Sequence, residues 1–229
     1  MPNKPAQKVL VVDDEEPILE LLKYNLEKQG YDVRTATDGQ IAVDVARKFH
    51  PDLVLLDIMM PKVDGVEACR QLRAMPELVN TYIVFLTARA EEYSEVAAFD
   101  VGADDYILKP IKPRALMSRI SALFRRDSSK KNTSGQIKVG ELIIDRTSYT
   151  VRLKGHEISL PKKEFELLFF LAQNPNKVFS RDDLLQNIWG VDVYVLSRTV
   201  DVHIRKVREK IGDDCIATVK GVGYKFNIQ

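Results

Sequence analysis

The chain has 229 residues, of which 45% are hydrophobic and 29% charged, the mixture expected of a soluble protein with proper cores. That length is generous for one domain and comfortable for two. Residues 1–126 hold 17 Lys and Arg against 20 Asp and Glu, a net charge of −3, whereas residues 127–229 hold 17 against 13, a net charge of +4. An acidic half joined to a basic half is compatible with nucleic-acid binding by the basic one.

Local patterns exclude several classes of protein. The longest apolar runs, such as Leu53–Leu56 and Tyr82–Leu86, are strand-length and far too short to cross a bilayer. Met1–Gln7 has no apolar stretch of signal-peptide length, so we expect a cytoplasmic protein with no membrane partner. Cys69 and Cys215 stand far apart and in no metal-ligand spacing, which favours two reduced thiols.

In the first half, short β-branched apolar runs alternate with longer amphipathic stretches. The predicted strands are Val9–Val12, Val33–Thr35, Leu53–Leu56, Ile83–Leu86 and Tyr106–Leu108. The predicted helices are Pro17–Gln29, Gln40–Lys48, Val66–Ala74, Glu92–Val101 and Pro113–Arg126. Five such strand–helix units predict a parallel sheet with helices on both faces.

After residue 126 the pattern changes. Asp127–Gly135 has no apolar residue and is predicted to be a flexible linker. Short alternating strands follow within Gln136–Leu160, and the chain closes with two strands about a Gly-Val-Gly turn at Gly221–Gly223. Between them lie helical patterns at Lys162–Gln173, Ser180–Trp189 and Ser197–Ile211. A sheet, three helices and a hairpin, in that order, predict an α+β winged helix-turn-helix domain over residues 136–229.

Five polar residues stand where predicted strands of the first half end: Asp13, Asp14, Asp57, Thr87 and Lys109. The carboxyl ends of parallel strands lie at one edge of a sheet, so we expect these side chains to converge in one crevice. Three neighbouring carboxylates repel one another unless a cation lies among them, and hard oxygen ligands suit Mg²⁺. Each residue alone is explained as a turn, helix cap or loop residue, but their joint occurrence favours phosphoryl transfer to a carboxylate.

The motifs at Val11–Glu15, Leu55–Pro61, Leu86–Arg89 and Gly102–Pro110 resemble those of response-regulator receiver domains, over residues 8–126. The resemblance implies a flavodoxin-like, doubly wound, five-stranded sheet, with Asp57 as the phosphoacceptor. It also implies that Asp14, Asp57 and the Met59 carbonyl bind Mg²⁺, with Asp13 assisting through water. Lys109 would contact the phosphoryl group, and the peptide bond between Lys109 and Pro110 would be cis. Thr87 and Tyr106 would form the conformational switch.

The predicted helix Ser197–Ile211 has one apolar face, and its basic residues lie on or near the opposite face. Such a helix suits a major groove, although the pattern taken alone favours an ordinary solvated surface helix. Motifs at Trp189–Gly190, Arg198–Arg208 and Val219–Tyr224 resemble the OmpR/PhoB subfamily of response regulators. The resemblance makes Ser197–Ile211 the recognition helix and Ala217–Ile228 the wing. We expect base contacts from Val202 and Lys206, and a packing role for His203. Phosphate contacts are expected from Arg198, Thr199, Arg205 and Arg208, and a minor-groove contact from Lys220.

The resemblance also predicts a homodimer of active receivers, through a surface to which Asp104, Asp105 and Arg119 belong. Glu95 replaces the usual basic residue and Ala115 the usual Glu, so that one charged pair is lost. Exposed pairs contribute only about 0–1 kcal/mol, so the dimer is weakened or rebuilt rather than lost. The loop Val191–Leu196 often touches RNA polymerase in this subfamily. Its sequence does not decide between activation and repression of transcription, which stay equally open.

The expected function is that of a phosphorylation-dependent transcriptional regulator. A sensor histidine kinase phosphorylates Asp57 with Mg²⁺, and the resulting homodimer binds double-stranded promoter DNA. The chain is not expected to be an enzyme beyond its own phosphorylation and dephosphorylation. The alternatives are a phosphorylation-independent DNA-binding dimer and, less favoured, a phosphorelay intermediate or a magnesium-dependent phosphohydrolase.

Overall fold

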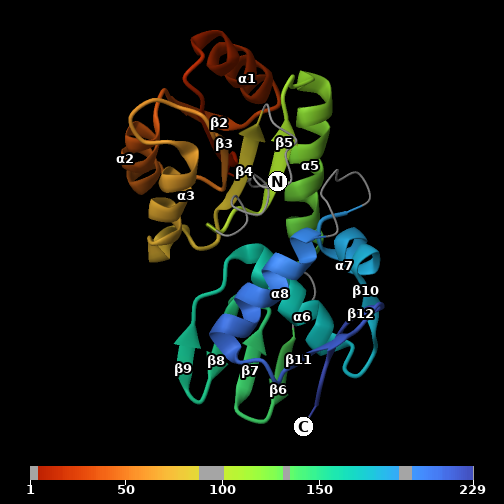
Figure 1. The fold of residues 1–229 in the computed structure, drawn as a ribbon. Helices are drawn as coiled ribbons and strands as arrows, with labels where there is room; N and C mark the ends of the chain where they lie inside the picture. Colours follow the sequence, from red (N-terminus) through yellow and green to blue (C-terminus); the bar gives the residue numbers. More distant parts are fainter. Residues whose placement is uncertain (1–4, 88–100, 131–134, 191–197, 229) are drawn as a thin grey trace. The chain divides into compact units, whose positions relative to one another are not determined.

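The computed structural model describes residues 5–87, 101–130, 135–190 and 198–228, which form two compact units that divide between Ser121 and Ala122 (Figure 1). The first unit has one sheet and the second has two, and each unit has its own buried apolar core. Among the described residues, no helix combines the length and the apolar character that crossing a membrane requires.

The first unit is built on a five-stranded parallel sheet in the order β2-β1-β3-β4-β5, as predicted. The strands are β1 (Lys8–Val12), β2 (Asp32–Ala36), β3 (Leu53–Asp57), β4 (Tyr82–Thr87) and β5 (Asp105–Leu108). Every residue of β3 and β4 is buried, which explains why their sequences are apolar without alternation.

The helices of this unit are α1 (Glu16–Lys28), α2 (Gly39–Phe49), α3 (Gly65–Arg73) and α5 (Pro113–Lys130), with a short 3₁₀ turn, η1, at Pro76–Leu78. Asp38 and Asp64 start α2 and α3, because their side chains accept hydrogen bonds from the backbone amides of Ile41 and Glu67 at 2.9 and 2.8 Å. In Figure 1, α2 and α3 lie side by side along the sheet. Most of the predicted helix Glu92–Val101 falls outside the described residues.

The strand order reverses once, between β1 and β3. The chain leaves β1 toward β2 on one side, whereas β3, β4 and β5 follow one another on the other side. Right-handed crossovers therefore put α1 on the opposite face of the sheet from α2 and α3. The connections diverge at this point and open a crevice beyond the carboxyl ends of β1 and β3, where ligands bind in open sheets of this kind.

The structure corrects the start of the predicted linker. Residues 127–130, which the sequence assigned to a flexible segment, continue α5 to Lys130. They contain neither Gly nor Pro, and adding residues to a helix that already exists is far easier than starting a new one. The absence of apolar residues therefore did not mean the absence of a helix. Residues 131–134 lie outside the described part of the chain.

The second unit has the predicted α+β architecture. It begins with a four-stranded antiparallel meander of β6 (Gln136–Val139), β7 (Leu142–Asp145), β8 (Thr150–Leu153) and β9 (His156–Ile158). Three helices follow: α6 (Lys162–Gln173), α7 (Arg181–Ile188) and α8 (Arg198–Ile211). The chain ends in a hairpin of β11 (Ile216–Val219) and β12 (Gly223–Phe226), and the two-residue strand β10 (Phe179–Ser180) pairs with β12.

Several polar side chains are built into this second core. Trp189 is buried with the ring of His203 edge-on at 4.9 Å, in agreement with the predicted packing role of that histidine. Arg146 is 3% exposed, forms an ion pair with Glu166 at 2.6 Å and lies over three aromatic rings. Lys163 is buried and donates to the Ile188 carbonyl at 2.6 Å. These cations therefore hold the domain together from inside.

Candidate functional site

The strand register brings the predicted acidic residues together at the switch point. Val12 is opposite Leu56, so Asp13 and Asp57, which come next in the chain, lie at the same level of neighbouring strands. Lys109 reaches this edge from β5, where its backbone amide donates to the Thr87 carbonyl at 2.7 Å. Residues distant in sequence thus share one crevice because they end parallel strands.

Lys109 bridges two buried carboxylates. Its Nζ lies 2.8 Å from Oδ2 of Asp13 and 3.2 Å from Oδ2 of Asp57. The side chains of Asp13 and Asp57 are 0% and 8% exposed and that of Lys109 is 14% exposed, so these charges interact with little screening. Glu15, which the sequence interpretation did not assign, lies 3.8 Å from the same nitrogen at the exposed rim. The position of Glu15 in the motif Val11–Glu15 could have indicated that it lies at this site.

The electrostatics of the crevice depend on this lysine. Burial raises the pKa of Asp57 above its usual range, although the charge of Lys109 and the backbone amide of Met59 act against the shift. Burial alone would lower the pKa of Lys109, but its contact with Asp13 and the charges of both carboxylates raise it above the usual value. Lys109 therefore remains an ammonium group, while burial disfavours the charged form of Asp57.

The same crevice fits a divalent cation. Asp13, Asp14 and Asp57 each offer a carboxylate oxygen, and the three oxygens lie within 4.8 Å of one another. Oδ2 of Asp13 is buried and accepts no hydrogen bond of good geometry, although it is ion-paired with Lys109. Asp14 is exposed, which leaves room for water. An all-oxygen set that keeps water suits Mg²⁺ better than a soft metal.

The loop that carries Met59 is held tightly against β3 and α2. The Gly65 amide donates to the Ile58 carbonyl at 3.0 Å, and a Cβ at Gly65 would lie 2.0 Å from the backbone oxygen of Asp57. Lys62 pairs with the helix-capping Asp38 at 2.5 Å. The sequence interpretation did not identify this support, although Asp64-Gly65 after the Met-Met-Pro motif was a signal of a tight turn into a helix.

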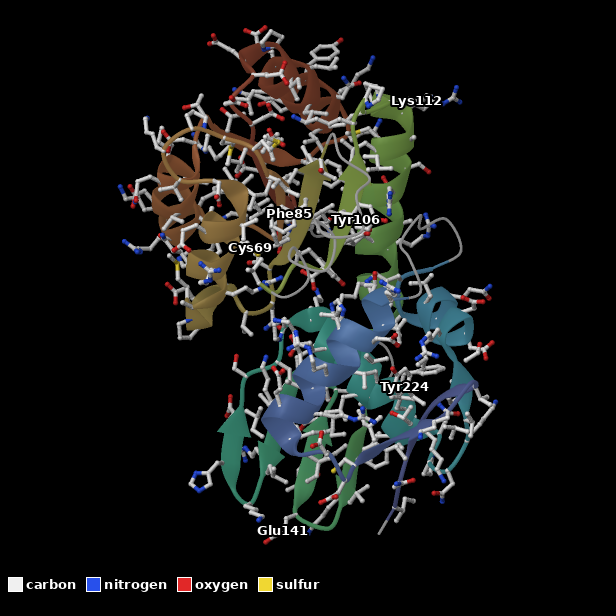
Figure 2. The ribbon with its side chains drawn as sticks, in the orientation of Figure 1. Cys69, Phe85, Tyr106, Lys112, Glu141 and Tyr224 are labelled. Atoms are coloured by element: carbon white, nitrogen blue, oxygen red, sulfur yellow. The ribbon has the colours of Figure 1, made fainter. Side chains whose placement is uncertain are left out.

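The proposed switch residues both lie in the core near the crevice. Thr87 is 7% exposed at the end of β4, where it pairs with Leu108, the residue before Lys109. Tyr106 is 5% exposed and pairs with Phe85 across β4 and β5; both are labelled in Figure 2. The Lys109–Pro110 bond is cis, as the resemblance implied.

Of the three residues expected at a dimer surface, two pair with each other and the third is buried. Asp105 and Arg119 form an ion pair within the domain at 3.1 Å. Asp104 is 1% exposed and accepts hydrogen bonds from Arg73 at 2.6 Å and from the Ile83 amide at 2.8 Å. This carboxylate is thus buried and engaged within its own domain, and its pairing across a dimer stays a prediction. Glu95 lies outside the described residues, and Ala115 is exposed.

The residues expected to contact DNA divide into two groups. Arg198, Arg205 and Lys220 are exposed, and Val202 and Lys206 are partly exposed, as contacts with DNA require. Thr199 is instead 2% exposed, one helical turn from the buried His203, which contacts its carbonyl. Arg208 is directed at the wing and donates to the Ile216 carbonyl at 2.7 Å and the Thr218 hydroxyl at 2.9 Å. The phosphate contacts expected of these two residues stay a prediction. The loop Val191–Leu196 lies outside the described residues.

A sheet crevice suited to Mg²⁺, followed by a winged helix with a basic surface helix, defines the class of transcriptional regulators that carry a receiver domain. Comparison with known families agrees with that class. Residues 9–121 match the response regulator receiver domain, and residues 155–226 match the family described as transcriptional regulatory protein, C terminal. The chain belongs to the two-component response regulators with an OmpR/PhoB-type DNA-binding domain.

Solved structures of similar proteins extend over both units. DrrB from Thermotoga maritima, an OmpR/PhoB homologue, is 37% identical over 97% of this chain and 99% of its own, with a TM-score of 0.51. A variant of RitR is 29% identical over 96% and 99%, with a TM-score of 0.76. The chemotaxis response regulator CheY4 of Vibrio cholerae is 30% identical over 52% of this chain and 98% of its own, with a TM-score of 0.50.

Proposed function

We propose that the chain is a phosphorylation-dependent transcriptional regulator in which Asp57 accepts a phosphoryl group from a sensor histidine kinase. The observation that carries the proposal is the position of Lys109, whose ammonium lies between the buried carboxylates of Asp13 and Asp57 at 2.8 and 3.2 Å. A lysine that served only to neutralise acidic residues would not need to lie at the carboxyl ends of parallel strands, where phosphate ligands bind.

The transfer needs little from the protein beyond charge and position. One oxygen of Asp57 attacks phosphorus, the P–N bond of the kinase phosphohistidine breaks, and the departing imidazole takes a proton from solvent. Lys109 leaves its contact with Asp57 to pair with the new phosphoryl oxygens. Mg²⁺, when held by Asp13, Asp14 and Asp57, supplies further positive charge to the phosphoryl oxygens. This chemistry is confined to the chain's own carboxylate, so the protein is a regulator rather than an enzyme with a separate substrate.

The conformational effect of phosphorylation then reaches the domain surface through Thr87 and Tyr106. Thr87 is the last residue of β4, at the edge of the crevice, and the Lys109 amide donates to its carbonyl. Its hydroxyl is therefore suited to move toward the phosphoryl group. The buried ring of Tyr106 repacks in response. Asp105 and Arg119, which pair within the domain, exchange partners across a homodimer.

The output is binding of promoter DNA in the cytoplasm. We assign α8 to the major groove, with Val202 and Lys206 toward bases and Arg198 and Arg205 toward phosphates. Lys220, exposed at the turn between β11 and β12, reaches the minor groove. Two such modules held by one receiver dimer bind more tightly than one, because the second contact becomes intramolecular.

The test is the intact mass of the protein after incubation with a small acyl-phosphate donor, with and without Mg²⁺. Wild type should gain one phosphoryl group only with Mg²⁺, Asp57→Asn should gain none, and Asp44→Asn, an exposed carboxylate on α2, should behave like wild type. A selected DNA duplex should bind more tightly after the gain. No gain together with intact duplex binding would support the phosphorylation-independent dimer instead, and turnover of a phosphomonoester without duplex binding would support the phosphohydrolase.

A further inference from the structure

Asp201, near the start of α8, is engaged by two other elements of the DNA-binding unit. Its Oδ1 accepts hydrogen bonds from Nε of Arg181 at 2.7 Å and from the hydroxyl of Tyr224 at 2.6 Å. Arg181 begins α7 and Tyr224 lies on β12, so one carboxylate joins a neighbouring helix and the wing hairpin to the proposed recognition helix. Tyr224 is labelled in Figure 2.

Arg208 makes a second tie from the same helix, seven residues after Asp201 and thus on the same face. Its guanidinium donates twice to the Ile216 carbonyl, at 3.1 and 2.7 Å, and once to the Thr218 hydroxyl at 2.9 Å. Its Cζ also lies 5.7 Å from the centre of the Tyr224 ring. Both strands of the wing are therefore tied to α8.

The start of β12, directly after the turn of the hairpin, also pairs with β10. Tyr224 and Gly223 pair with Phe179 and Ser180 of β10. A Cβ at Gly223 would lie 1.9 Å from the Phe179 carbonyl, so only glycine allows this approach. The turn that carries Lys220 directly precedes Gly223 and is exposed. The contacts of Asp201 and Arg208 therefore act on the two strands that flank this turn.

We infer that Asp201, Tyr224 and Arg208 are positioning residues for DNA recognition, which set the distance and angle between the recognition helix and the wing. The inference rests on the proposed DNA-binding function. A domain that touches two grooves gains most when both contacts are already spaced correctly, because no ordering remains to be done on binding. In this arrangement Arg208 contributes by holding β11, and not by contacting a phosphate.

The burial of the network separates this role from a general contribution to stability. The side chains of Arg181 and Asp201 are 34% and 38% exposed, and ion pairs this exposed to solvent contribute little to folding. The network is nevertheless geometrically specific, because one carboxylate oxygen accepts two short hydrogen bonds. Its removal should therefore affect the placement of the wing more than the folding of the domain.

The experiment is a double-mutant cycle between Tyr224→Phe and Lys220→Ala in the full-length chain. The probe is a duplex selected from a random-sequence pool by wild type in the presence of the phosphodonor, and affinity is read by fluorescence anisotropy. Tyr224→Phe removes only the hydroxyl and should weaken binding about tenfold. In the Lys220→Ala background the same change should cost less than about twofold, because a wing without its lysine gains nothing from correct placement.

The matched control is Tyr149→Phe, which removes another tyrosine hydroxyl of the same unit, one that donates to Glu166 at 3.1 Å. This variant should keep wild-type affinity for the duplex. Arg208→Lys keeps the charge but loses the fork that holds β11, so it should weaken binding as Tyr224→Phe does.

Three results would overturn the inference. The first is an equal cost of Tyr224→Phe with and without Lys220, and the second is wild-type binding by Arg208→Lys. The third, no duplex bound by the wild-type chain, would overturn the proposed function itself, and the inference with it.

Discussion

The guanidinium of Arg73, at the end of α3, donates a 2.6 Å hydrogen bond to the carboxylate of Asp104, just before β5. The two side chains are 9% and 1% exposed. Arg73 also donates to the carbonyls of Gly102 and Thr81 at 2.8 and 2.7 Å. One buried arginine thus fastens the entry of β5 to the start of β4.

Replacing this arginine should therefore destabilise the receiver. Arg73→Ala leaves the Asp104 carboxylate buried without its cation, which costs about 3 kcal/mol of the free energy of unfolding. Calorimetry of the full-length chain should show the loss in the receiver transition. Fluorescence of Trp189, the only tryptophan, should show no change in the winged-helix unit. Arg70→Ala, whose side chain is 62% exposed, is the control and should cost at most about 1 kcal/mol. Equal effects of the two variants would contradict the buried-pair explanation.

Asp57→Asn should stabilise the metal-free receiver while it abolishes phosphorylation. Burial raises the pKa of Asp57, so the folded state disfavours the carboxylate form. A raised carboxyl pKa contributes stability below the unfolded value of about 4, and this contribution is lost as pH rises through the folded value. The variant should therefore melt higher than wild type at pH 7, by about 4 °C for each kcal/mol gained in a domain of this size. The difference should disappear near pH 3, and an unchanged melting temperature at pH 7 would count against it.

Mg²⁺ should stabilise the receiver, since the ion binds three carboxylates that the unfolded chain does not hold together. At one hundred times its dissociation constant the gain is about 2.7 kcal/mol. Asp13→Asn should largely remove the magnesium-dependent rise in melting temperature, whereas Glu20→Gln, an exposed carboxylate on α1, should keep it. A rise of the same size in both variants would place the ion elsewhere.

Gly65→Ala should displace the loop after β3 and slow phosphorylation of Asp57. The new Cβ would lie 2.0 Å from the Asp57 backbone oxygen, so the loop or the strand end must move. Forced overpacking of this kind costs roughly 1–3 kcal/mol. Gly135→Ala, where nothing lies within 4 Å of the added carbon, is the control. The rate of phosphoryl gain by intact mass decides the matter, and a wild-type rate in Gly65→Ala would show that the close approach is unimportant.

High pH should weaken the winged-helix unit through Tyr224. Burial, followed by the hydrogen bond to Asp201, raises the pKa of Tyr224 from 10.0 to about 12. The stabilisation is therefore complete below pH 10 and is lost as pH rises to about 12, with a loss of roughly 3 kcal/mol at most. The urea midpoint of Trp189 fluorescence should fall in this window more for wild type than for Tyr224→Phe. Equal slopes in the two proteins would exclude Tyr224 as the cause.

The receiver crevice was predictable from the sequence because it depends on a local rule. Residues that end parallel strands meet at one edge, so Asp13, Asp57 and Lys109 could be brought together once the strands were located. The burial of Asp104 was not predictable in this way. It depends on Arg73, a residue 31 positions earlier in the chain. Nothing in the local pattern of either residue signals that partnership.

In the DNA-binding unit, too, tertiary contacts could not be predicted from the local sequence pattern. Helical periodicity located α8 and its apolar face, and that part of the prediction is confirmed. Periodicity cannot tell which basic residues face DNA and which face the domain, because this depends on how the wing folds back against the helix. The contacts of Arg208 with the wing and the burial of Thr199 could therefore not be predicted from the helix alone.

Some basic residues of the second unit are engaged within the domain, which reduces the share of its positive charge that can act on DNA. Arg146, Lys163 and Arg208 direct their donors at groups of their own domain, yet all three count toward its net positive charge. Counterions leave a duplex only in proportion to the phosphates that a protein neutralises. Affinity for the operator should therefore fall less steeply with ionic strength than the number of basic residues suggests. The domain would distinguish its site by fit in the grooves more than by bulk attraction to the polyanion.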